Sequence, residues 1–213
     1  MLDQILFGFA AVVAFILSCS IVVAVLKNLC IHRVLWLLSF ILLFVLTTLI
    51  SLSGLDVISA PFVYLLASLI PSFLACGLIY ATLGSRWGKY YLTYTLLLFI
   101  VFTYASIVGG IPKTPLILLL HVPSGFIIVI LPFVAVVLRI SELTALFVSI
   151  GGLLIGVGGV ALATIQFGAP LLPQELVNMV FAPLFLIVTI MFAAGMLLTK
   201  NWGRPKGLND LRR

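Results

Sequence analysis

A histidine and a serine three residues apart form the most reactive pair of side chains in this chain. They stand in the segment His121-Val122-Pro123-Ser124-Gly125. A serine nucleophile needs a base that takes its proton and a third group that orients the base. Here both residues lie on the same predicted helix, and the other histidine, His32, lies in a predicted loop. The pair therefore has neither an orienting group nor a second base.

The neighbours of Ser124 also differ from those of intramembrane serine nucleophiles. Rhomboid-type proteases hold their serine in a Gly-x-Ser-Gly turn and take the histidine from a separate helix. The residue two positions before Ser124 is Val122 and not glycine. We expect no enzymatic activity. Instead, Pro123 and Gly125 predict a kinked, closely packed helix in which Ser124 satisfies backbone groups.

His121 is the histidine that stands inside a long apolar run, about one and a half helical turns, or roughly 8 Å, from the outer end of that run. One interpretation is functional: a substrate contact, a proton-sensitive switch or a haem ligand. The other is structural, with a neutral imidazole bonded to a carbonyl that Pro123 frees. Bis-histidine haem ligation needs a second buried histidine, which His32 does not provide. The remaining interpretations stay open.

A second group of polar side chains surrounds Pro71 in another apolar run. If the chain binds a small molecule, we expect the site between this group and the histidine–serine segment, with lining residues Ser68, Ser72, Tyr80, His121 and Ser124. The cysteines have no Cys-x-x-Cys spacing, and no cluster of histidines and carboxylates accompanies them. We therefore expect neither a bound metal nor a cofactor.

The elements that must position these residues are membrane-spanning helices. The chain has 213 residues, of which 64% are hydrophobic and 8% charged, whereas soluble domains are about half apolar and a quarter charged. A span needs about 20 apolar residues, so residues 1–213 form a single all-α domain with no room for a soluble one. The seven predicted spans are Ile5–Leu26, Val34–Ser53, Pro61–Leu83, Leu92–Val108, Pro115–Leu138, Leu143–Ile165 and Leu176–Leu198.

The basic residues predict the orientation of these spans. With the N-terminus outside, ten of the eleven lysines and arginines face the cytoplasm and only Lys113 lies on the outer side. The cytoplasmic set is Lys27, Arg33, Arg86, Lys89, Arg139, Lys200, Arg204, Lys206, Arg212 and Arg213. A short basic tail, residues 200–213, is therefore cytoplasmic. The net charge of +6 is explained by attraction to an anionic lipid leaflet, and no nucleic acid partner is expected.

The acidic residues lie in predicted loops, at the termini or at span ends. Proton relays and ion pathways need charge inside the membrane, so an ion-coupled pump is not expected. The chain carries no Asn-x-Ser/Thr acceptor and no CaaX ending. The simplest location is a prokaryotic cytoplasmic membrane.

Two further patterns concern packing and anchoring. Gly152, Gly156 and Gly159 form a smooth strip at helical spacing, which allows another helix to approach closely. The tryptophans, at positions 36, 87 and 202, all fall near predicted cytoplasmic span ends, which is typical of membrane-interface anchors.

Two of these tryptophans stand in similar short motifs. Trp87-Gly88-Lys89 follows the third span, and Trp202-Gly203-Arg204 follows the seventh. A parallel 3+1+3 repeat, in which spans one to three resemble spans five to seven, would explain the similarity. Interfacial tryptophan beside a basic residue is also common without any repeat, so both explanations stay open.

Three classes of function fit these features. The first is a non-catalytic subunit or scaffold that packs against other membrane subunits, or against copies of itself. The second is a small transporter or channel for a neutral or weakly polar solute, with a site near His121. The third is a membrane sensor, although the basic tail is too short for an output domain. The absence of charge within the spans and the lack of extramembrane mass favour the first.

Overall fold

The structure is a computed structural model that describes residues 2–109, 113–166 and 171–202. The described residues form seven helices that are long and apolar enough to cross a membrane, which confirms the predicted all-helical, seven-span architecture. Two short 3₁₀ turns, η1 (Leu55–Ser59) and η2 (Leu143–Ala145), join them. The helices are α1 (Leu2–Lys27), α2 (Ile31–Ser53), α3 (Pro61–Thr82), α4 (Ser85–Val108), α5 (Lys113–Val137), α6 (Leu146–Gln166) and α7 (Gln174–Leu198).

The start of α4 differs most from the sequence prediction. Hydropathy places the start of the fourth span at Leu92, whereas the helix begins two turns earlier, at Ser85. Gly84 makes the turn after α3 with a φ of 93°, a conformation that favours glycine. The first turns of α4 carry arginine, lysine, tryptophan and tyrosine. Such residues suit the membrane interface, so a helix continues where the hydropathy signal fails.

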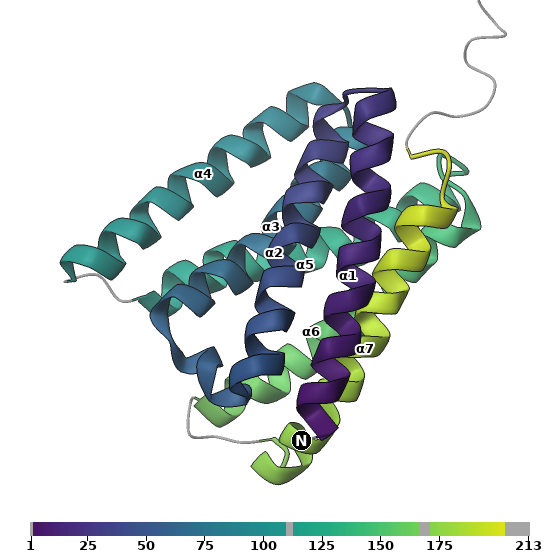
Figure 1. The fold of residues 1–213 in the computed structure, drawn as a ribbon. Helices are drawn as coiled ribbons and strands as arrows, with labels where there is room; N and C mark the ends of the chain where they lie inside the picture. The colour runs from purple at the N-terminus through teal and green to yellow at the C-terminus, as the bar shows by residue number, and fades with distance from the viewer. Residues whose placement is uncertain (1, 110–112, 167–170, 203–213) are drawn as a thin grey trace, which may run out of the picture.

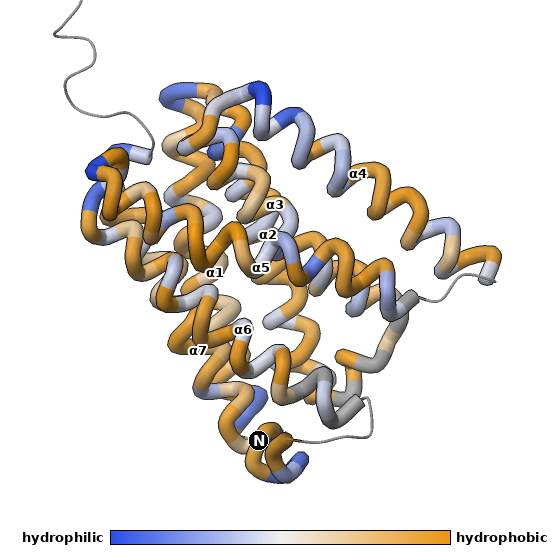
Figure 2. Tube along the Cα trace, turned by 180° about the vertical axis from the view of Figure 1, so that it is seen from behind, coloured by the Kyte–Doolittle hydropathy of each residue, from blue (hydrophilic) through white to orange (hydrophobic). Residues whose placement is uncertain are grey.

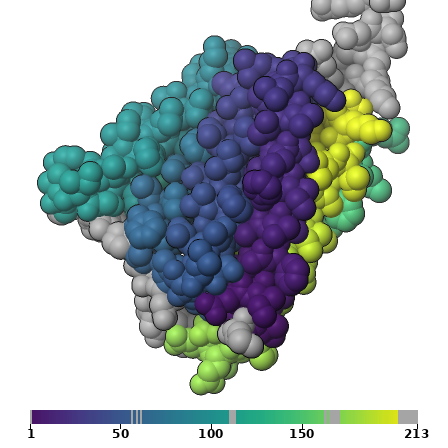
Figure 3. Space-filling model, viewed as in Figure 1, coloured from purple at the N-terminus to yellow at the C-terminus, as the bar shows by residue number. Residues whose placement is uncertain are grey.

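Six of the helices form a closed ring. Contacts join α1 to α2, α2 to α3, α3 to α5, α5 to α6, α6 to α7, and α7 back to α1. The remaining helix, α4, lies outside the ring and packs on α3 and α5 (Figure 1). Side chains of α1, α2 and α7 lie next to one another in one continuous face (Figure 3).

The order of helices around the ring is the order that a 3+1+3 repeat requires. The helices α1, α2 and α3 follow one another in the ring, and α5, α6 and α7 follow in the same sense. A half-turn about the ring axis would exchange the two groups, and α4 would be the linking helix. The order in which the helices contact one another around the ring is compatible with the repeat, which stays a prediction.

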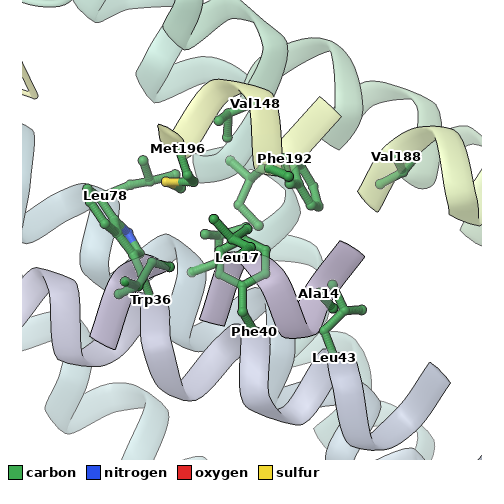
Figure 4. Packing of buried hydrophobic residues seen from close by; sticks show 14 of the residues in the cluster. Ala14, Leu17, Trp36, Phe40, Leu43, Leu78, Val148, Val188, Phe192 and Met196 are labelled. Atoms are coloured by element: carbon green, nitrogen blue, oxygen red, sulfur yellow. The ribbon is translucent and has the colours of Figure 1, made fainter. Parts of the chain in front are cut away.

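The interior of the ring is filled by a cluster of buried apolar side chains from all six ring helices. Leu17 of α1 and Phe40 of α2 lie next to each other in this cluster, and Phe192 of α7 belongs to it as well (Figure 4). Because lipid tails are as apolar as leucine, burying these side chains gains little from leaving water. Van der Waals contact between closely fitted groups is what stabilises the cluster.

Close helix approach depends on glycine at several positions. A Cβ on Gly77 of α3 would lie 2.4 Å from Nε1 of Trp36 on α2. A Cβ on Gly195 of α7 would lie 2.5 Å from a methyl group of Val148 on α6. At these two contacts, the backbone of one ring helix therefore packs directly against a side chain of the neighbouring helix.

The basic ends of the helices come together at one end of the molecule. The residues Ser141 and Trp202 form a backbone bridge that joins the turn after α5 to the segment after α7. The ring of Trp202 lies 5.4 Å from that of Trp36, near the start of α2. Figure 2 shows many of the hydrophilic residues at this end, including the start of α4, and a mixture of hydrophobic and more polar residues along the rest of α4.

Gly77→Ala should destabilise the fold by about 1–3 kcal/mol, because the added methyl group overlaps the Trp36 indole in a well-packed site. The matched control is Gly125→Ala in α5, where a Cβ would meet nothing within 4 Å. Thermal unfolding in mild detergent, followed by circular dichroism, should show a lower midpoint for Gly77→Ala only. Equal midpoints for the two variants would contradict this account of α2–α3 packing.

Candidate functional site

Three hydroxyl groups from three helices meet between α3, α4 and α5. Ser124 Oγ on α5 lies 3.2 Å from Ser72 Oγ on α3 and 2.8 Å from the Tyr91 hydroxyl on α4. Both serines are fully buried. The structure thus brings together Ser72 and Ser124, two of the residues predicted to line a binding site. It adds Tyr91, which the sequence prediction missed.

The protons of this hydroxyl cluster are accounted for by backbone carbonyls. Ser124 donates to the carbonyl of Leu120, and Ser72 donates to the carbonyl of Ser68 at 2.8 Å. Because each hydroxyl has one proton, Tyr91 is the donor in its bond to Ser124. The cluster has no spare donor for a ligand. Its geometry is that of a connection between helices, in which such bonds contribute about 0.6 kcal/mol on average.

A second tyrosine of α4 satisfies the carbonyl that Pro123 leaves free. Proline has no N–H, so the carbonyl four residues earlier, that of Leu119, loses its helical partner. The hydroxyl of Tyr94 donates to this carbonyl at 2.6 Å. This corrects the structural interpretation of His121, because the freed carbonyl is bonded by a tyrosine from another helix.

The other predicted lining residues do not join the cluster through their side chains. His121 is exposed on α5, and within the described residues it makes no hydrogen bond. Ser68 donates to the carbonyl of Tyr64 within its own helix. Tyr80 is buried, and its ring packs where Gly88 leaves room for it. Of the five residues predicted to share one site, Ser72 and Ser124 therefore meet, whereas the side chains of Ser68, Tyr80 and His121 lie in other surroundings.

The glycine strip of α6 divides between two surroundings. A Cβ on Gly152 would lie 2.8 Å from the side chain of Ile128, so this glycine packs against α5. A Cβ on Gly156 or Gly159 would meet nothing within 4 Å, and both residues are exposed. Packing through Gly156 and Gly159 thus stays a prediction for a partner helix outside this chain.

The three tryptophans also differ in how deeply they are buried. Trp36 is only 5% exposed and packs against His32 and Trp202, so it is a core residue, and its role as a membrane-interface anchor stays a prediction. Its place in the core follows from Gly77, which opens space beside α3. Trp202 is partly buried against it. Trp87 is 60% exposed, as an anchor requires.

A shallow groove of about 260 Å³ runs along the first turns of α4 beside the end of α3. Four aromatic residues line it at positions 87, 90, 91 and 94. This i, i+3, i+4, i+7 spacing places them on one face of a helix. This spacing in the sequence could have indicated an aromatic helix face, but the fourth span was predicted to begin after most of these residues.

Metal ligands do not cluster in the part of the chain that the structure describes: no three histidine, cysteine or carboxylate side chains lie close enough together to hold an ion. Comparisons with protein-family models, curated proteins and solved structures give no match to this chain.

The bond between Tyr91 and Ser124 should be measurable as a coupling between two mutations. Tyr91→Phe and Ser124→Ala should each lower the free energy of unfolding by about 0.5–1.5 kcal/mol, and the double variant should lose less than the sum. The control is Tyr90→Phe, because Tyr90 is 59% exposed. Unfolding with sodium dodecyl sulfate in mixed micelles provides the measurement. Strict additivity would show that this bond does not connect α4 to α5.

Proposed function

We propose that this chain is a non-catalytic helical subunit or scaffold of a larger membrane protein complex. The observation that carries the proposal is the filled interior of the six-helix ring, where side chains from every ring helix pack together. A scaffold needs a rigid packed body, whereas a solute site needs a cavity or cleft, mostly apolar and with a few placed polar groups. The cluster of buried side chains suits the first requirement.

The state of the buried hydroxyls supports the same proposal. Tyr91 donates to Ser124, Ser72 and Ser124 donate to carbonyls of their own helices, and Tyr94 satisfies the carbonyl freed at the α5 proline. These polar groups hold helices together. None of these four hydroxyls has a proton left to offer a substrate.

The outward face of α6 offers a surface for a partner subunit. Gly156 and Gly159 are exposed, and the side chains around them are apolar and exposed as well, namely Leu153, Val157 and Val160. Small residues flanked by larger apolar ones let two transmembrane helices approach closely and gain van der Waals contact. The partner is either another subunit or a second copy of this chain.

A small transporter for a neutral or weakly polar solute is the second candidate. One observation favours it: the ring order has the two-fold pattern of transporters built from parallel repeats, which bind substrate between the repeats. In this case His121, which is exposed on α5, would be the first residue to test as a substrate contact.

For the orientation, we propose an outer N-terminus and a cytoplasmic C-terminus in a prokaryotic cytoplasmic membrane. The positive-inside distribution of lysine and arginine supports this orientation. The gathering of the basic helix ends at one end of the molecule is compatible with it. The anionic leaflet would then face this end.

Replacing Gly156 and Gly159 together by leucine should remove partner subunits that co-purify with the wild-type chain in mild detergent. The bulky side chains would hold a partner helix away from α6. The matched control is Cys19→Leu, a small-to-large change at an exposed position of α1. Affinity purification followed by size-exclusion chromatography measures the loss. A wild-type chain that purifies alone and transports a solute in proteoliposomes would favour the second candidate.

Cysteine labelling in intact cells tests the orientation. In a variant without native cysteines, Lys113→Cys should react with a membrane-impermeant maleimide, whereas Lys89→Cys should react only after the cells are opened. The reason is that these residues lie on opposite sides of the membrane in the proposed topology. The reverse pattern would invert the orientation.

A further inference from the structure

The groove beside α4 combines an apolar floor with exposed aromatic side chains. Ile79 of α3 and Leu83, directly after α3, form one side, and four aromatic residues of α4 form the other. Leu83, Trp87 and Tyr90 are 54%, 60% and 59% exposed. The groove is therefore open to the surroundings of the helix bundle.

The aromatic side of the groove is held in place by the contacts of α4. Two of its members, Tyr91 and Tyr94, have their hydroxyls bonded to α5. Gly88 lets the ring of Tyr80 pack closely against the start of α4. The ring of Trp87 lies 6.2 Å from that of Tyr90 in an edge-on arrangement. The groove is thus preformed and does not need to be assembled by its occupant.

Positive charge lies at the same end of α4. Arg86 and Lys89 are both exposed, and Arg86 stands one helical turn before Tyr90. Residue Gly84 caps the helix without a side-chain bond, so the first N–H groups add a partial positive charge. Two bases and a free helix start thus border an apolar groove.

Acidic residues are absent from the stretch of sequence around these two bases. The first turn of α4 has none, and the sequence from residue 57 to residue 141 contains no aspartate or glutamate. The next carboxylate along the chain, Glu142, accepts bonds from the backbone of Lys200 and the side chain of Asn201. Arg86 and Lys89 therefore have no acidic residue beside them in this stretch of the sequence.

We propose that this groove binds an anionic phospholipid. The lipid phosphate lies at Arg86, Lys89 and the start of α4, and an acyl chain lies along the groove between α3 and α4. Tryptophan and tyrosine suit this position because their rings are apolar and their polar edges reach the headgroup layer. A zwitterionic lipid would leave the two bases without net compensation, so the site distinguishes lipids by charge. The site does not depend on whether the chain is a subunit or a transporter.

Native mass spectrometry of the full-length, delipidated protein in detergent tests this proposal. The probes are dioleoylphosphatidylglycerol, dioleoylphosphatidylcholine and glycerol phosphate, each titrated separately. We expect tight binding of about one phosphatidylglycerol, weaker binding of phosphatidylcholine, and no retained glycerol phosphate. The last arm separates a lipid from its free headgroup. Equal retention of the two lipids, or retention of glycerol phosphate alone, would overturn the proposal.

Matched variants place the site on the chain. Arg86→Gln with Lys89→Gln should weaken phosphatidylglycerol binding by roughly fivefold for each charge removed, the change that about 1 kcal/mol represents. The control, Lys27→Gln with Lys200→Gln, removes the same charge from other exposed positions at this end. Trp87→Ala with Tyr90→Ala should weaken the binding of both lipids, because it removes the aromatic wall of the groove. Circular dichroism verifies folding, and an equal effect of the two charge variants would overturn the proposed location.

Discussion

The hydrocarbon layer offers no water to backbone or hydroxyl groups, and this constraint organises the structure. An unsatisfied carbonyl in lipid costs several kcal/mol. The carbonyl that each proline in a span leaves without a helical N–H partner must therefore be bonded by another group. At Pro123 the group is Tyr94, whose hydroxyl reaches the Leu119 carbonyl from a neighbouring helix. Tyr91 makes a second bond one turn away, to Ser124. These two bonds hold α4, the helix outside the ring, to α5.

Close packing is the second source of stability, and it depends on where backbone surface is bare. Gly77 receives the Trp36 indole, Gly88 receives the Tyr80 ring, and Gly152 receives Ile128. At each place a large side chain takes the space that a methyl group would otherwise occupy. The glycines of α6 differ in this respect: Gly152 packs against a side chain, whereas a Cβ on Gly156 or Gly159 would meet no atom within 4 Å. A filled ring with bare glycines on its outer face suits a body that other helices pack against.

The candidate site shows how far sequence reasoning extends. Ser72 and Ser124 were expected to share a site, and they do meet, because serines on facing sides of neighbouring helices are natural bonding partners. Tyr91 was missed, since it belongs to a helix turn whose hydropathy resembles that of a loop. His121 and Ser124 are three residues apart, yet one is exposed and the other buried. The boundary between the buried and exposed faces of a helix depends on its neighbours, which spacing alone does not reveal.

The sequence by itself determined the all-helical class, the number of spans and the sorting of charge, because these follow from local hydropathy and from the cost of placing charge in lipid. Only the tertiary structure decided that six helices close a ring while α4 stays outside it. It also placed Trp36 in the core and left Trp87 exposed beside an open groove. The physical reason is that apolar side chains look alike in a membrane protein sequence, whether they face lipid or another helix. Which of the two they face depends on contacts between segments far apart in the chain.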